Sequence, residues 1–283
     1  MDAKDPVWSD WHPVAVVSDI RENLSYDTQL LGVAITYCKR GALYEVSRAD
    51  GGTCNITERY ATIWVALTTT APDFFPLPEF AEADRRVVSA GSIRLNVSGL
   101  RAVENFLDMS HFPFVHTDIL GAEPQTEVLP YDVSVDAATG EILATNCRFV
   151  QPKGSAIAQG SIETLYIYRV ARPYIAILYK NSHSSPERLD ALCLFIQPVN
   201  EDWCIAHTVM VYIDDISSDE QLRHFQQTIF GQDLMILVNQ VPRRLPLDAL
   251  QENPVRADKM SSAYRRMLRD SHVRYGTYSA SAH

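Results

Sequence analysis

The chain has 283 residues, of which 46% are hydrophobic and 21% are charged, a composition typical of globular rather than disordered proteins. Its 25 basic and 35 acidic residues give a formal net charge of −10, which disfavours nucleic acid as a partner. The sequence has no apolar run of about 18 residues and no apolar signal segment at its start. We therefore predict a cytoplasmic protein that does not enter a membrane.

Short apolar runs separated by turn residues fill the first part of the chain, at 14–17, 30–38, 42–46 and 61–67. This pattern is typical of a small β module. Three prolines, at 72, 76 and 78, then interrupt the pattern and predict a linker. We therefore divide the chain into a β module over residues 1–70 and a second domain over residues 71–283.

The second domain is predicted to be a run of strands followed by helices. A strand over 92–97 and a helix over 100–110 come first, and longer strands follow at 127–136, 141–151, 161–170, 174–180, 191–199 and 203–213. Ser218, with the acids that follow it, predicts the start of a long helix that continues to Asn239, and a last helix covers 257–271. This order indicates an α+β fold with an antiparallel sheet wrapped around a long helix.

Two histidines and an aspartate lie close together in the segment 104–116. Asp108 and His111 are three residues apart, so a helix would place them on one face. His111 and His116 are about 140° apart around a regular helix and cannot share a face. Pro113 between them would end the helix because it lacks an N–H group, and the broken chain would bring His116 to the same point. The segment predicts two imidazoles at one metal; the alternative is two hydrogen-bonded histidines without a metal.

Asp233 lies in an otherwise apolar helical stripe, with apolar residues at 229, 230, 236 and 237. A carboxylate on a buried face must be paired or bound to a cation, which makes Asp233 the candidate for a third ligand. The alternative is an exposed acid at the edge of the stripe. Two histidines and one carboxylate, with open positions opposite, suit a non-haem Fe(II) that must bind oxygen.

The sequence of residues 105–116, Asn-Phe-Leu-Asp-Met-Ser-His-Phe-Pro-Phe-Val-His, closely resembles the iron-binding segment of Rieske non-haem iron oxygenases, and in particular of their demethylase branch. Other segments resemble further parts of that family: 11–20, 30–32, 229–233 and 257–266. The resemblance implies a helix-grip catalytic domain after a truncated Rieske-type module. It also implies that His111, His116 and Asp233 bind Fe(II), and that Asp108 bridges an iron ligand to the electron-donating cluster.

The sequence departs from the family where the cluster should be bound. A Rieske [2Fe–2S] centre needs two cysteines and two histidines, arranged in the family as C-x-H and C-x-x-H. Residues 44–60 contain only Cys54, and no histidine lies between His12 and His111, so we predict no cluster-binding residues. The C-x-x-H formed by Cys204 and His207 is in a predicted strand, where residues three apart point to opposite faces. We interpret it as a coincidence.

An iron site without a cluster resembles the Rieske-less components of bacterial methylxanthine degradation. That resemblance implies that a separate reductase carrying a Rieske domain supplies the [2Fe–2S] cluster, and that the system consumes O2 and NAD(P)H. It implies a trimer or hetero-oligomer, with further subunits of a demethylase complex. It also implies oxidative N-demethylation of a methylxanthine, 7-methylxanthine to xanthine and formaldehyde.

A substrate of that kind is small, flat and heteroaromatic, and needs apolar walls with a few polar groups. Gln227 and Phe230 precede Asp233 on the same predicted helix, and we predict that they contact the substrate. The alternative function is that of a non-catalytic helix-grip subunit, which binds or scaffolds within a multi-subunit oxygenase.

Overall fold

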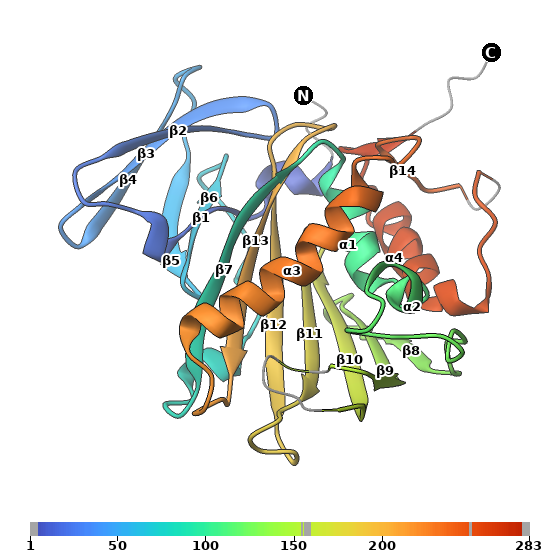
Figure 1. The fold of residues 1–283 in the computed structure, drawn as a ribbon. Coiled ribbons are helices and arrows are strands. Elements are labelled where there is room, and N and C mark those ends of the chain that lie inside the picture. Colours follow the sequence, from blue (N-terminus) through green and yellow to red (C-terminus); the bar gives the residue numbers. More distant parts are fainter. Residues whose placement is uncertain (1–4, 154, 156–159, 249–250, 279–283) are drawn as a thin grey trace.

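The computed structural model describes residues 5–153, 155, 160–248 and 251–278. Its central element is a seven-stranded sheet in which every neighbouring pair is antiparallel, in the order β7-β13-β12-β11-β10-β9-β8 (Figure 1). The strands are β7 (Arg86–Leu95), β8 (Asp132–Val135), β9 (Ile142–Gln151), β10 (Ile162–Arg172), β11 (Ile175–Asn181), β12 (Leu189–Pro198) and β13 (Cys204–Tyr212). The predicted antiparallel sheet is confirmed.

The long helix α3 (Asp219–Leu237) lies across one face of this sheet (Figure 1). Ser218 caps it, since its side chain accepts from the Gln221 backbone while the Gln221 side chain accepts from the Ser218 backbone. The helix is attached to β7 because the Gln227 side chain donates to the carbonyl of Ala90, at 2.8 Å. The predicted arrangement of an antiparallel sheet around a long helix is therefore confirmed.

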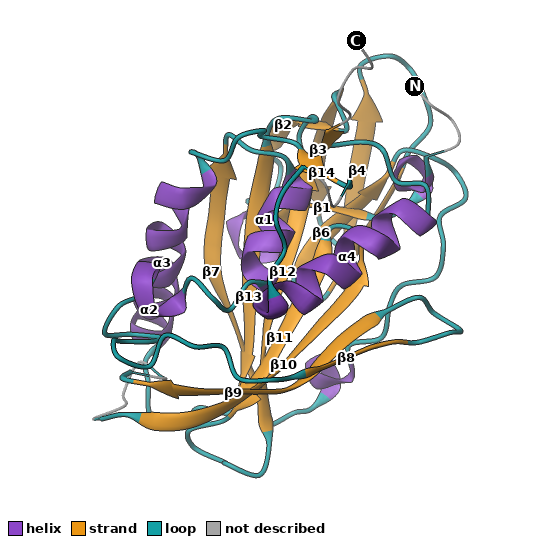
Figure 2. Cartoon of the chain, turned by 90° about the vertical axis from the view of Figure 1, so that its right-hand side faces the viewer, coloured by secondary structure: helices purple, strands orange, loops and turns teal. Residues whose placement is uncertain are grey.

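Three other α-helices lie over the face of the sheet, as Figure 2 shows: α1 (Gly99–Leu107), α2 (Phe112–Val115) and α4 (Lys259–Asp270). α1 packs against β11, β12 and β13, and α4 contacts α1, β8 and β9. Beside them is a short parallel pair, β14 (Leu245–Pro246) with β15 (Thr277–Tyr278). Four short 3-10 turns complete the helical elements of the described residues: Pro6–Ser9, Val17–Asp19, Pro78–Ala81 and Arg256–Asp258. No helix within the described ranges is long and apolar enough to cross a membrane.

The N-terminal strands form two three-stranded sheets. The first has the order β1-β6-β5, and the second is the meander β2-β3-β4. Their bounds are β1 (His12–Val16), β2 (Ser25–Leu30), β3 (Val33–Arg40), β4 (Leu43–Arg48), β5 (Asn55–Arg59) and β6 (Thr62–Ala66). β1 packs against β12 of the large sheet, so β12 is covered on both faces and buried along nearly its whole length.

Trp64 of β6 is the anchor of this contact. Its ring is fully buried and lies edge-on to Phe195 of β12, with ring centroids 5.0 Å apart. The linker after β6 adds Phe74 and Phe75 around the same indole. The indole N–H donates to the carbonyl of Arg59, so the buried nitrogen has its hydrogen bond.

We predict that Trp64→Ala lowers the free energy of unfolding by about 3–5 kcal/mol, because it leaves a large cavity between the two sheets. The measurement is chemical denaturation followed by circular dichroism. Leu43→Ala is the control, since Leu43 is 71% exposed and its truncation leaves no cavity. A loss below about 1 kcal/mol for Trp64→Ala would mean that this contact does not hold the N-terminal sheets to the rest.

Candidate metal centre

The first helix of the site ends earlier than the sequence predicted. α1 stops at Leu107, and Asp108 follows in an extended conformation, with φ −78° and ψ 130°. The prediction that Asp108 and His111 share a helical face is therefore wrong. They still meet, because the turn after α1 brings His111 Nδ1 to 3.0 Å from Asp108 Oδ2.

The predicted role of Pro113 also needs correction. Pro113 does not end the first helix; it lies in the first turn of α2, where the missing N–H group costs nothing. His111 and His116 flank this one-turn helix as its N-cap and C-cap. Gly121 packs directly against its start, where any Cβ atom would lie 2.8 Å from the backbone nitrogen of Pro113. The two histidines are thus held at the ends of a rigid turn.

Asp233 of α3 completes a triangle of donor atoms. His111 Nε2 lies 3.1 Å from His116 Nε2. Asp233 Oδ1 lies 3.2 Å from His111 Nε2 and 3.1 Å from His116 Nε2. These residues form the one group of three or more metal-ligating side chains among the described residues whose donor atoms converge in this way. Asp233 is 9% exposed, so it is not the exposed acid of the alternative interpretation.

The spacing of the three atoms suits a metal. Donors at adjacent corners of an octahedron, each about 2.2 Å from a shared ion, are about 3.1 Å apart. Three such donors on one side leave the opposite side open for other ligands. Two imidazoles with one carboxylate in this arrangement are typical of non-haem ferrous sites that bind oxygen. The donor set therefore fits Fe(II).

The outer nitrogens of both imidazoles have hydrogen-bond acceptors. His111 Nδ1 donates to Asp108, and His116 Nδ1 donates to Gln232 Oε1 at 2.9 Å. With each proton held on Nδ1, both Nε2 lone pairs face the centre of the triangle. Asn105 holds the third donor, since its Nδ2 donates to Asp233 Oδ1 at 3.0 Å.

Electrostatics at this point favour a bound positive charge. Burial alone would lower the pKa of His111, but hydrogen bonds to Asp108 and Asp233 outweigh it and raise the pKa to about 9. Burial alone would raise the pKa of Asp233, but hydrogen bonds from His111 and His116 lower it to about 2. Burial alone would also raise the pKa of Asp108, but interactions with His111 and hydrogen bonds from Ser110 outweigh burial and lower the pKa. Both carboxylates are ionised, and a metal cation would take the place of the His111 proton.

An aromatic and apolar cavity adjoins the triangle. Its lining residues, besides the three candidate ligands, are Asn105, Phe106, Phe112, Leu120, Tyr166, Tyr168, Leu178, Lys180, Leu192, Phe225, Gln226, Ile229 and Phe230. Phe230 lies where the sequence analysis placed it, at the cavity. Gln227 does not line the cavity and instead donates to β7. Its neighbour Gln226, which the sequence analysis did not select, is buried and lines the cavity.

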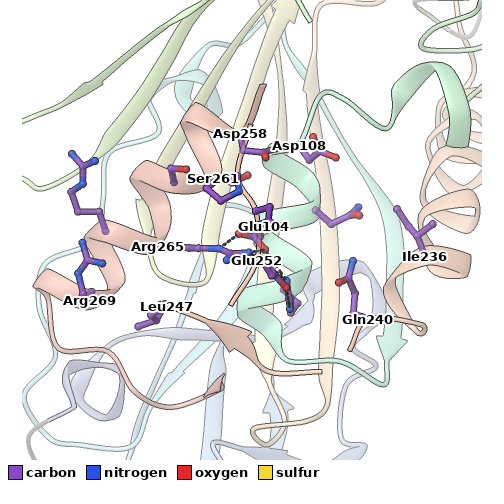
Figure 3. Close-up of a pocket in the computed structure, with 16 residues that line it drawn as sticks. Glu104, Asp108, Ile236, Gln240, Leu247, Glu252, Asp258, Ser261, Arg265 and Arg269 are labelled. Atoms are coloured by element: carbon purple, nitrogen blue, oxygen red, sulfur yellow. Dashed lines mark hydrogen bonds and ion pairs between the residues drawn. The ribbon is translucent and has the colours of Figure 1, made fainter. Parts of the chain in front are cut away.

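A second, more polar groove of about 550 Å³ lies on the other side of α1, between α1, the end of α3 and α4 (Figure 3). Asp108 is at its edge, so one carboxylate borders the groove and also contacts a candidate iron ligand. Two ion pairs support the groove: the largely buried pair of Arg265 with Glu104 at 2.5 Å, and the pair of buried Arg101 with the partly exposed Glu252 at 2.5 Å.

The C-x-x-H pair, which the sequence analysis interpreted as a coincidence, lies in the core of the large sheet. Cys204 is fully buried in the core of β13. His207 is also buried, and its ring nitrogens contact Ser92 Oγ at 2.8 Å and Gln197 Oε1 at 3.4 Å. Burial lowers the pKa of His207 to about 3, so the imidazole is neutral at physiological pH. Neither residue belongs to the converging donor group.

Comparison with known proteins gives the family. Residues 96–274 match the profile of the vanillate O-demethylase oxygenase C-terminal domain. The chain is 56% identical over 273 residues to a probable methylxanthine N7-demethylase, NdmC, of Pseudomonas sp. (strain TJI-51), with 96% of each chain covered. The chain belongs to the Rieske-type non-haem iron oxygenases.

Two further comparisons agree. The oxygenase is 28% identical over 255 residues to methylxanthine N1-demethylase NdmA of Pseudomonas putida, across 87% of this chain and 67% of that relative. The solved structure of NdmA from Pseudomonas putida CBB5 with caffeine matches with a TM-score of 0.74 at 18% identity, covering 98% of each chain. The structural likeness supports the fold.

We predict that His111→Ala, His116→Ala and Asp233→Ala each reduce bound iron to below about a tenth of the wild-type content, because each removes one of three protein donors. Metal analysis of the purified protein after incubation with Fe(II) measures this. His224→Ala is the matched control, since His224 is an exposed histidine on the same helix as Asp233. Stoichiometric iron in any of the three variants would remove that residue from the ligand set.

Proposed function

We propose that this chain is an oxygenase component that removes the N7-methyl group of a methylxanthine, converting 7-methylxanthine to xanthine and formaldehyde. The convergence of His111, His116 and Asp233 at the wall of an aromatic cavity carries the proposal. The 56% identity to a probable methylxanthine N7-demethylase over 96% of both chains supports the choice of substrate. A complete donor set in an oxygenase family also favours catalysis over the alternative of a non-catalytic scaffold subunit.

The reaction is a hydroxylation followed by a spontaneous cleavage. The N-methyl group, O2, two electrons and two protons give an N-hydroxymethyl group and water. The N-hydroxymethyl group then loses formaldehyde and leaves a ring N–H. A ferrous ion held by the three side chains would supply the activation of oxygen.

The residues of the chain position and protect this chemistry. Asp108 and Gln232 hold the two imidazoles in one tautomer, and Asn105 fixes the carboxylate of Asp233. Aromatic rings around the donor triangle exclude water and offer flat surfaces to a flat ring, and Phe230 is one of them. The Gln226 amide can both donate to a ring carbonyl or nitrogen and accept from a ring N–H. We propose Gln226 and Phe230 as substrate contacts, in place of Gln227.

Residues 1–70 contain neither the C-x-H nor the C-x-x-H motif of a Rieske cluster, and we propose that electrons come from another protein. We propose that these residues are the cluster-less counterpart of a Rieske domain, and that an NAD(P)H-dependent reductase carrying its own Rieske [2Fe–2S] cluster is the partner. The groove beside Asp108 is the proposed docking place, since Asp108 joins it to His111 by one hydrogen bond. We further propose a trimer or hetero-oligomer in the cytoplasm.

Asp108→Asn tests the electron path. We predict that the variant keeps its iron, because Asp108 is not among the three donors, while coupled turnover falls roughly 10–100-fold, as is typical when a partner of a ligand histidine is lost. Iron content and NADH-dependent formaldehyde release are measured on the same sample. Asp270→Asn, a change at an exposed carboxylate, is the control. Turnover at the wild-type rate in Asp108→Asn would refute this role.

The partner requirement is tested with purified components. The chain alone should show no iron–sulfur absorption in the visible region and no NADH-dependent demethylation of 7-methylxanthine. Adding the cluster-bearing reductase should give turnover, and a reductase that lacks only its Rieske domain should not. Full activity with the truncated reductase, or an iron–sulfur signal from the chain alone, would contradict the proposal.

A further inference from the structure

The cavity beside the metal centre contains one lysine. Lys180 of β11 is the single lysine or arginine among the described residues that line this cavity. The rest of the lining, apart from the candidate ligands, consists of aliphatic and aromatic side chains and two amides. A ligand in this cavity would therefore meet one cationic side chain among the described lining residues, apart from the candidate ligands.

Lys180 lies away from the metal. It lines the cavity together with Phe225, and both residues also line a small polar recess next to it. Phe225 and Asp233 are eight residues apart on α3, which corresponds to about 12 Å along a helix. The residues that line this cavity of about 60 Å³ therefore run from the donor triangle to Phe225 and Lys180.

The sheet fixes the position of this lysine. Lys180 pairs in register with Asp190 of β12, so the two side chains lie on the same face of the sheet. Its ammonium lies over the ring of Tyr212, 5.3 Å from the ring centroid. Burial lowers the pKa of Lys180, while the nearby carboxylates of Asp190 and Asp214 act in the opposite direction. A ligand oxygen would replace one of its present contacts, which the flexible four-carbon stem permits.

The shape of the proposed substrate places one edge of its ring system at the Lys180 end of the cavity. In a purine-2,6-dione, N7 is on the five-membered ring, and the edge formed by N1, the C2 oxo group and N3 is at the opposite side of the molecule. With the N7-methyl group at the metal centre, that edge faces Lys180. In 7-methylxanthine both of its nitrogens carry N–H, whereas in caffeine both carry methyl groups.

We propose that Lys180 determines specificity by donating a hydrogen bond to the C2 oxo group of the substrate, so that rings with a free N–H beside this oxo group are preferred over fully methylated ones. The inference rests on the proposed function for the direction in which the substrate lies. An ammonium binds a lactam oxygen by a charge-assisted hydrogen bond. A methyl group on the neighbouring nitrogen blocks the approach of the ammonium to that oxygen.

Lys180→Met is the direct test, because it keeps the length of the stem and removes the charge. Calorimetric binding of 7-methylxanthine to the iron-loaded chain should weaken about 10-fold or more, the range for a lost hydrogen bond to a charged group. Caffeine binding should change by less than about 3-fold. Lys180→Arg, which keeps a cation, should retain most of the affinity for 7-methylxanthine.

Lys153→Met is the matched control. Lys153 is exposed, its ammonium lies 5.9 Å from the centroid of the Phe225 ring, and it is not among the cavity-lining residues. Removing this charge should leave both affinities unchanged. Equal losses in Lys153→Met and Lys180→Met would show a general charge effect and overturn the inference. Should Lys180→Met fail to fold, Lys180→Gln supplies the same comparison.

Turnover with the cluster-bearing reductase separates this inference from the proposed function. A wild-type chain that neither binds nor demethylates 7-methylxanthine refutes the proposed function, and the inference with it. The other outcome is that the wild-type chain demethylates 7-methylxanthine, and that Lys180→Met is as selective against caffeine as the wild type, both in binding and in kcat/KM. This result refutes the inference alone. The expected result is a selectivity ratio reduced about 10-fold in Lys180→Met.

Discussion

Three donor atoms that would repel one another without a cation are held within about 3 Å by the fold, and the rest of the site depends on that convergence. With a cation in place of the extra proton of His111, both imidazoles keep one proton on the outer nitrogen, and two Nε2 lone pairs and the Asp233 carboxylate face one point. Such a cluster of acceptors is stable only with a positive charge among them. The end of α1, the one-turn helix α2 and the C-terminal half of α3 together form this cluster of donor atoms.

The surroundings keep these three elements in place. α3 is attached to β7 through Gln227, so Asp233 cannot slide along the sheet. α1 is tied to α4 by the buried pair of Glu104 with Arg265, and breaking one partner of such a pair is costly. Asn105 then connects α1 to α3 through Asp233. The positions of the three candidate metal donors are therefore determined by contacts between elements far apart in the sequence.

Much of this was accessible from the sequence, for identifiable reasons. Long apolar strands and a capped helix predict the antiparallel sheet and its long helix, because these signals are local. The segment 105–116 points to iron through its resemblance to the iron-binding segment of the family, since its spacing alone left both a metal and two hydrogen-bonded histidines possible. The local path of the chain was not accessible. The turn after Leu107 is closed by hydrogen bonds to the Asp108 carboxylate, and the new helix at Phe112 packs against Gly121.

The choice between Gln226 and Gln227 could have been made from the sequence. Asp233 is seven residues from Gln226, almost two full turns, so these two residues share a helical face. Gln227 is rotated by about 100° from Gln226 around the helix axis. Gln232 was missed because its position beside Asp233 points it away from the metal, toward the outer nitrogen of His116. Lys180 gave no sequence signal, since a lysine in a strand is ordinarily an exposed residue.

The central claim is that one iron is bound by His111, His116 and Asp233 in a chain that has no cluster of its own. X-ray absorption at the iron edge of the Fe(II)-loaded chain tests it most directly, because it reports the atoms around the metal. The account predicts nitrogen and oxygen neighbours only, with the multiple-scattering pattern of two imidazoles. Sulfur neighbours or a second iron nearby would contradict it.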